Sequence, residues 1–148
     1  MKKTIIAFVA ILLLFQLIPL EKTNPPIDPQ LKLNTDANVM EILKKSCFDC
    51  HSNETNWPFY ASIAPFSFFV TSHVNDARKA LNFSNYNSII PEIKERRLKR
   101  AIVTVKNESM ALPSYRFAHE SAKLSKEEKE KLLAWLENEI KKFSSIKY

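Results

Sequence analysis

The chain has 148 residues and a mass of 17.1 kDa, a length that suits one compact domain. Apolar residues make up 45% and charged residues 26% of the composition, so the chain can bury a packed core and is not expected to be disordered. The formal charge of +6 is spread along the chain, and we therefore expect no nucleic-acid binding. Because glycine is absent, other residues must form the tight turns.

Residues 1–20 have the layout of an export signal. Lys2 and Lys3 precede a 16-residue, mainly apolar run over 5–20. The run ends without small residues for a cleavage site, which favours an uncleaved signal anchor over a cleaved signal peptide. A helix over this run reaches about 24 Å, somewhat less than a hydrocarbon core of about 30 Å. The lysines predict an inner-membrane anchor with the domain in the periplasm, or secretion to the periplasm if the leader is cleaved.

Residues 21–35 are predicted to form a proline-rich stalk, and residues 36–148 a helical domain of about four helices without strands. The first helix should begin at Asp36 and end at the cysteines. The second should begin at Pro65 and the third at Pro91. The stretch 107–119 has no period and is predicted to be a loop. In the last helix, Ser125 and Glu128 should form a capping box.

Hydrophobic periodicity predicts which side chains of these helices face the core. The second helix should turn one face inward, made by Phe66, Phe69, Val70, His73, Val74, Ala77 and Leu81. The third helix should point a run of five cations mostly outward, namely Lys94, Arg96, Arg97, Lys99 and Arg100. This run is either a solvated helix face or a docking patch for an acidic redox partner or anionic lipid.

The two cysteines of the chain lie in one motif, Cys47-Phe48-Asp49-Cys50-His51, which is the attachment signature of c-type haem. Two thiols separated by two residues can form thioethers with the two vinyl groups of one haem. The adjacent imidazole of His51 is then the proximal iron ligand. The sequence therefore predicts one covalent haem c.

Two other uses of the cysteine pair remain open. A thiol–disulfide protein of the thioredoxin type would place the pair near a βαβ pattern, which the sequence lacks. A zinc site would need further ligands, and only His73 and His119 are left to supply imidazoles.

The sixth iron position has three candidate ligands. Met110 lies in a proline-containing loop, where its thioether could reach the iron, and it is our first choice. His73 is the alternative, either as a ligand or as part of the haem pocket, because it is expected on an apolar helix face. His119 is expected to be solvated in a polar loop. Trp57 and the neighbouring phenylalanines are expected to pack the core and the haem pocket.

These residues together resemble a known family of small envelope haem-binding domains with a single Cys-x-x-Cys-His motif, related in plan to monohaem cytochromes c. The matching segments are Cys47 to Asn53, Trp57 to Tyr60, His73 and Val74, Leu81 to Ser84, Leu112 to Tyr115, and the helix from Leu124 to Trp135. The resemblance implies a cytochrome c-like helical fold around one haem, with electron transfer as its role.

We therefore expect a monohaem electron-transfer module with His/Met ligation and no catalytic residues. Its partners should be the membrane and a redox protein, which is acidic if it docks on the run of five cations. The alternative is an open-site haem enzyme or a small-ligand sensor for peroxide or gas, in which the sixth position is vacant.

Overall fold

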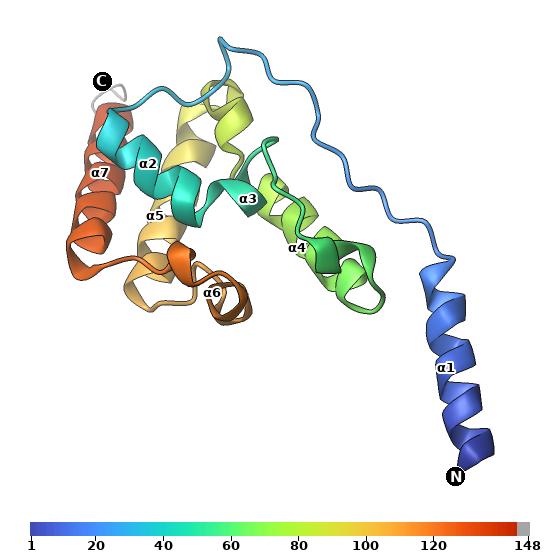
Figure 1. Cartoon of the computed structure of the whole chain (residues 1–148). Coiled ribbons are helices and arrows are strands. Elements are labelled where there is room, and N and C mark those ends of the chain that lie inside the picture. The colour runs from blue at the N-terminus through green and yellow to red at the C-terminus, as the bar shows by residue number, and fades with distance from the viewer. Residues whose placement is uncertain (145–148) are drawn as a thin grey trace.

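The computed structural model describes residues 1–144, in which all regular structure is helical and no strand occurs (Figure 1). The all-α prediction is therefore confirmed for this part of the chain. The α-helices are α1 (Lys2–Gln16), α2 (Ala37–Ser46), α3 (Phe48–His51), α4 (Phe66–Ala80), α5 (Pro91–Lys106), α6 (Pro113–Ala118) and α7 (Lys126–Ser144). Short 3-10 helices are η1 (Phe59–Ser62), η2 (Phe83–Ser88) and η3 (Glu120–Ala122).

The four predicted domain helices correspond to α2, α4, α5 and α7. The third begins at Pro91 as predicted, whereas the second begins at Phe66, one residue after Pro65. Asp36 caps α2, because its carboxylate accepts a hydrogen bond from the Val39 N–H at 3.0 Å. At the start of α7, the Glu128 N–H donates to Ser125 Oγ at 3.1 Å, and the Ser125 N–H donates to the Glu128 carboxylate at 2.7 Å. The predicted capping box is thus confirmed.

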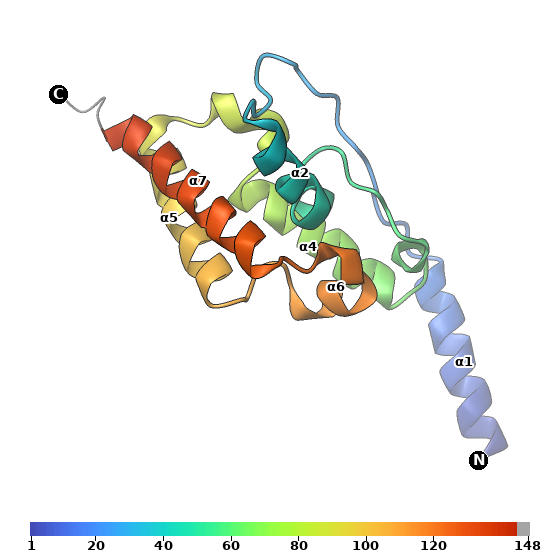
Figure 2. The same ribbon diagram turned by 60° about the vertical axis from the view of Figure 1, so that its left-hand side comes forward.

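The core lies where α7 packs against α5 and α2 (Figure 2). Leu43 of α2, Leu98 of α5 and Leu132 of α7 are buried there, each 2% exposed or less. Phe48 of α3 stacks on Phe83 with ring centroids 5.3 Å apart, which joins the cysteine motif to this core.

The leader forms α1, none of whose residues is buried. Within residues 1–144, no helix has the combination of length and apolarity needed for a membrane crossing. The segment that follows α1 has no regular structure, and it lies against the domain. The Asn24 amide donates to the Thr55 carbonyl at 2.9 Å, and Arg78 donates to the Thr23 carbonyl at 2.9 Å.

Two details of the predicted fold are wrong. The stretch 107–119 contains α6, whose six residues are too few to show a helical period in the sequence. Lys94 does not point outward but is 6% exposed. Its ammonium lies 4.5 Å from the ring centre of Tyr86 and 4.9 Å from that of Phe143, so two aromatic faces replace part of its hydration.

The inward face predicted for α4 is also only partly buried. Val74 is 2% exposed, but Phe66 is 58% and Phe69 is 68% exposed. Ser67 and Thr71, which the periodicity placed elsewhere, are buried instead. The apolar side of α4 thus faces a space that the described residues do not fill, and this space is part of the candidate site.

Candidate functional site

The cysteine motif forms one helical turn directly after α2. The helical conformation is interrupted at Cys47, and α3 begins with the next residue. The His51 N–H donates to the Cys47 carbonyl at 2.8 Å. The Cys50 N–H donates to the same carbonyl at 3.2 Å. Among the described residues both cysteines are free, partly buried thiols on the same turn. The local backbone therefore brings together the three residues that the sequence predicted to act together.

Burial keeps these thiols protonated. It raises the pKa of Cys47 to about 12, with a smaller contribution from the nearby Cys50. Burial also raises the pKa of Cys50 to about 11, and Asp49 adds to this effect while Arg78 opposes it. A thiol used in disulfide exchange needs a lowered pKa, because the thiolate is the attacking species. The environment of the motif is therefore opposite to that of a redox-active dithiol.

The imidazole of His51 is held by a backbone carbonyl. Its Nδ1 lies 2.8 Å from the carbonyl oxygen of Leu81, which can only accept, so Nδ1 carries the proton and donates it. Burial lowers the pKa of His51, although this hydrogen bond opposes the shift, so the ring is neutral. The lone pair is consequently on Nε2, which is the arrangement of a metal-ligating histidine whose other nitrogen is fixed by a carbonyl.

A buried polar network fixes the loop after the motif. Ser52 and Asn53 are 0% and 4% exposed. The Asn53 N–H donates to Ser84 Oγ at 2.9 Å, and the Asn82 amide donates to Asn53 Oδ1 at 2.8 Å. Arg78 Nε donates to the Ser52 carbonyl at 2.8 Å. These contacts hold α3 beside the end of α4, and periodicity could not find them because the residues lie about 30 positions apart.

A cavity of about 570 Å³ opens beside the motif, between α4 and α6. Its volume lies within the range of about 300–1,000 Å³ that is typical of ligand and cofactor sites. The wall is mostly apolar and is formed by Asp49, Cys50, Thr55, Asn56, Pro58, Tyr60, Phe66, Phe69, Val70, His73, Val74, Leu112, Ser114, Tyr115, Phe117 and Ala118. Of the predicted site residues, Cys50 and His73 are in this wall, whereas Cys47, His51, Trp57 and Met110 lie outside it.

Polar contacts at the edge of the cavity join α6 to the motif. The Tyr115 hydroxyl donates to the Asp49 carboxylate at 2.5 Å, and the Asn56 N–H donates to the same carboxylate at 3.0 Å. Burial and the Asp49 carboxylate raise the pKa of Tyr115, so the hydroxyl remains a donor. His119 is not solvated as predicted: it stacks on Tyr115 at 4.4 Å, and its Nε2 lies 2.7 Å from the Tyr60 hydroxyl.

His73 is exposed, and it lies on the α4 side of the cavity. Its Nδ1 is 2.7 Å from the Phe69 carbonyl, one helical turn earlier, so this nitrogen also carries the proton. The His73 and Phe69 rings stack with centroids 6.2 Å apart. Within the described residues its Nε2 has no hydrogen-bond partner, which leaves it available to whatever occupies the cavity.

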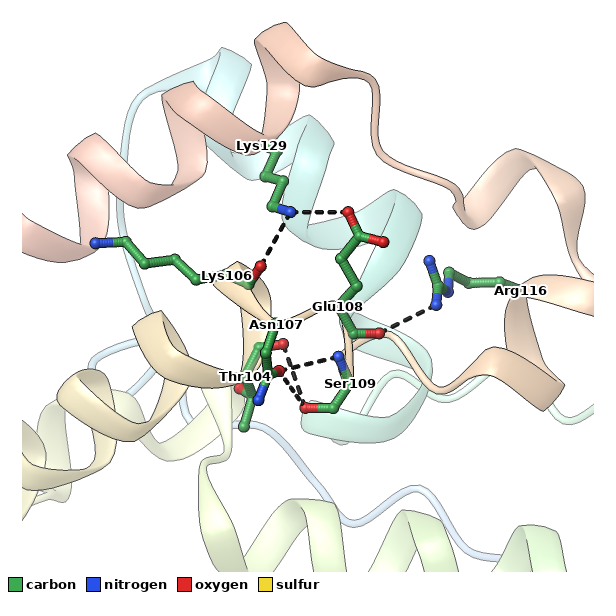
Figure 3. Close-up of polar contacts among 7 residues, drawn as sticks. All are labelled: Thr104, Lys106, Asn107, Glu108, Ser109, Arg116 and Lys129. Carbon is green, nitrogen blue, oxygen red and sulfur yellow. Dashed lines mark hydrogen bonds and ion pairs between the residues drawn. The ribbon is translucent and has the colours of Figure 1, made fainter.

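The loop that carries Met110 is braced by α7 and α6 (Figure 3). Lys129 of α7 donates to the Lys106 carbonyl at 3.3 Å and pairs with the Glu108 carboxylate at 3.0 Å. Arg116 of α6 donates to the Glu108 carbonyl at 3.0 Å. Inside the loop, Ser109 Oγ donates to Asn107 Oδ1 at 2.7 Å. Several elements thus fix a short, exposed segment.

Glu108 adopts a left-handed conformation, with φ of 60°, at a position where most chains would use glycine. Such a conformation costs about 1–2 kcal/mol for a residue with a side chain and persists only where the surroundings enforce it. Met110 follows two residues later and is 38% exposed. A strained and braced loop is typical of a segment that must hold one side chain in place.

The fold and the site together define a class: an all-helical domain in which one turn presents two partly buried thiols and a carbonyl-anchored imidazole beside an apolar cavity. Residues 10–138 match the family described as the haem-binding domain, and the chain belongs to this family. It is therefore a haem-binding protein. Comparison with curated proteins and with solved structures gives no match. Within residues 1–144, no cluster of three or more His, Cys, Asp or Glu could hold a metal ion, so the zinc alternative has no ligand set there.

Proposed function

We propose that this chain is a c-type haem protein with one covalent haem, and that it acts as a monohaem electron-transfer module facing the periplasm. The single observation that carries the proposal is the state of His51: its Nδ1–H is held by the Leu81 carbonyl, and its neutral Nε2 follows directly after two thiols on one turn.

The residues present fit a haem. Cys47 and Cys50 supply protonated thiols for two thioether bonds, and the cavity beside Cys50 has an apolar wall. Trp57 has a buried indole N–H without a partner among the described residues, but it lies outside the cavity wall. When bound, the haem supplies an iron that accepts and releases single electrons. The protein holds the group, excludes water and sets the potential through its axial ligands.

We propose Met110 as the sixth ligand. One wall of the cavity comes from α4, and the Leu81 carbonyl that holds the His51 ring directly follows this helix. If haem is bound, a thioether from Met110 would be a ligand that raises the reduction potential. The other wall of the cavity comes from Leu112 and α6, and the braced loop with Met110 leads into that wall.

The covalent haem is tested with the full-length chain expressed in a bacterium that attaches haem c in its envelope. Intact-mass analysis should show one haem per chain, and a C47A/C50A variant should show none. A colourless wild-type chain without added mass would refute the proposal. Met110→Ala should remove the far-red sulfur-to-iron absorption band of the oxidised protein, and His73→Ala should keep it. The reverse result would make His73 the ligand.

One observation favours an open-site enzyme or sensor as a second candidate. His73 and Tyr60 lie in the cavity wall, and the free Nε2 of His73 could bind a polar ligand there. Carbon monoxide distinguishes the two functions, because it should bind rapidly to the reduced protein only if the sixth position is open. Slow or incomplete binding supports the electron carrier.

Features of α1 and α5 support a proposal for the location and the partners. We propose that α1 anchors the protein in the inner membrane, because it is apolar on all sides, has no buried residue and begins with Lys2 and Lys3. Arg96, Lys99 and Arg100 are exposed on α5, and their charge suits an acidic redox partner.

A further inference from the structure

The segment around η1 and the start of α4 differs from the rest of the surface in composition. Residues 55–75 contain no Lys, Arg, Asp or Glu, whereas these types make up 26% of the chain. Several apolar side chains in this segment are exposed rather than packed. Phe59 is 80%, Ile63 is 46% and Phe66 is 58% exposed. We call this group the aromatic corner: it consists of the two aromatic residues Phe59 and Phe66 and of Ile63 between them.

The aromatic corner is joined to the end of α1. Gln16 of α1 donates from Nε2 to the Ser62 carbonyl at 2.7 Å, and its Oε1 accepts from the Ala64 N–H at 3.0 Å. Phe15 contacts Phe68 edge to face, with ring centroids 6.2 Å apart. Figures 1 and 2 both show the C-terminal end of α1 beside this part of the domain. Because α1 contacts this segment, the surroundings of α1 also determine the surroundings of the aromatic corner.

We propose that the aromatic corner is a lipid-contacting surface that sits in the headgroup region of the membrane. This inference rests on the proposed anchoring by α1. A charge-free surface with exposed aromatic side chains suits the boundary between headgroups and acyl chains, where such rings are enriched.

The length of α1 gives a reason for this contact. Its 15 residues span about 22 Å, which is shorter than a hydrocarbon core of about 30 Å. A short apolar segment draws its flanking groups toward the bilayer. Apolar side chains at an interface enter it by about 5–10 Å, so the aromatic corner extends the apolar surface of α1. Lys22, whose ammonium donates to Ser62 Oγ at 2.5 Å, lies beside it where anionic headgroups would be.

The aromatic corner also borders the cavity. Phe66 belongs both to the aromatic corner and to the cavity wall, and so links the two. A domain that rests on the aromatic corner therefore holds one end of its cavity close to the membrane surface. Val103 of α5 is 59% exposed, has no such neighbour in α1 and should face water.

The test uses the full chain, with its haem, in vesicles of phosphatidylethanolamine and phosphatidylglycerol. The photoreactive residue p-benzoylphenylalanine replaces Phe59, Ile63 or Val103 in turn, and the irradiated protein is analysed by intact mass. We expect phospholipid adducts at positions 59 and 63 and none above background at position 103. The aromatic replacement of Phe59 is conservative, so the fold should persist.

Other outcomes overturn the proposal. A covalent dimer formed from position 59 would show that a second copy covers the aromatic corner. The absence of any adduct at 59 and 63 would show that the corner faces water. Equal lipid labelling at 59, 63 and 103 would show that the contact is unspecific. The same mass spectrum reports the haem adduct, so a failure of haem attachment is seen separately from a failure of lipid contact.

Discussion

The hydrogen bond between Tyr115 and Asp49 should control how easily the Met110 loop opens. Tyr115 lies on α6, directly after this loop, and Asp49 lies between the two cysteines. Their contact of 2.5 Å therefore ties the wall on the α6 side of the cavity to the haem-attachment turn. Tyr115→Phe removes the hydroxyl and keeps the ring that stacks on His119.

The magnitude follows from the geometry. Hydrogen bonds to charged groups contribute about 1.5–3 kcal/mol, and the low end applies here because the tyrosine is only partly buried. The Asp49 carboxylate keeps its second bond, from the Asn56 N–H at 3.0 Å, so it is not left unpaired in the variant. A loss of about 1.5 kcal/mol raises the population of the open loop roughly tenfold.

The assay is the rate at which cyanide binds to the oxidised protein, because cyanide enters only when the sixth ligand has left. Tyr115→Phe should bind cyanide roughly tenfold faster, in line with the open-loop population, and should keep the far-red band. Tyr86→Phe is the matched control, since it removes a similar bond in the core, where the hydroxyl donates to Glu139 at 3.0 Å. Faster binding in the control, or an unchanged rate in Tyr115→Phe, would refute this account of the loop.

Variants at Lys129, Ser125 and Tyr86 test other contacts. Lys129→Met should raise the same cyanide rate by about fivefold or less, because the lost hydrogen bond to the Lys106 carbonyl is worth about 1 kcal/mol, whereas the exposed Lys131→Met should leave the rate unchanged. Ser125→Ala should lower the free energy of unfolding in urea by about 1 kcal/mol without altering the haem spectrum. Burial and a neighbouring carboxylate raise the pKa of Tyr86 above 10.0, so its stabilising effect is present below that pH and is lost as the pH rises further. Urea titrations of Tyr86→Phe should accordingly show a smaller loss of stability at alkaline pH than the wild type.

Elements with a long apolar period and a clear cap could be predicted from the sequence. The capping box at Ser125 and the cap at Asp36 depend on residues three positions apart, so local patterns suffice. Lys94 could not be predicted, because its burial depends on Tyr86 and Phe143, which come from two other elements. The missed helix α6 is short and owes its place to contacts with the motif and the loop.

In the candidate site, too, local features could be predicted from the sequence and contacts between distant segments could not. The motif supplies Cys47, Cys50 and His51 at fixed local spacing, so the sequence alone indicates which atoms would bind a haem. The carbonyl that fixes the His51 tautomer belongs to Leu81, and no local rule predicts that pairing. The cavity also depends on α4 and α6 approaching the motif from distant parts of the chain.

The two residues between the cysteines explain how one turn contacts both the core and the edge of the cavity. Consecutive residues of a helix point about 100° apart, so Phe48 and Asp49 face different neighbours. Phe48 is 4% exposed and stacks on Phe83 in the core. Asp49 accepts from Tyr115 and Asn56 at the edge of the cavity. An apolar residue followed by an acidic one therefore fixes the rotation of the turn, and with it the directions in which the thiols and the imidazole can reach a bound haem.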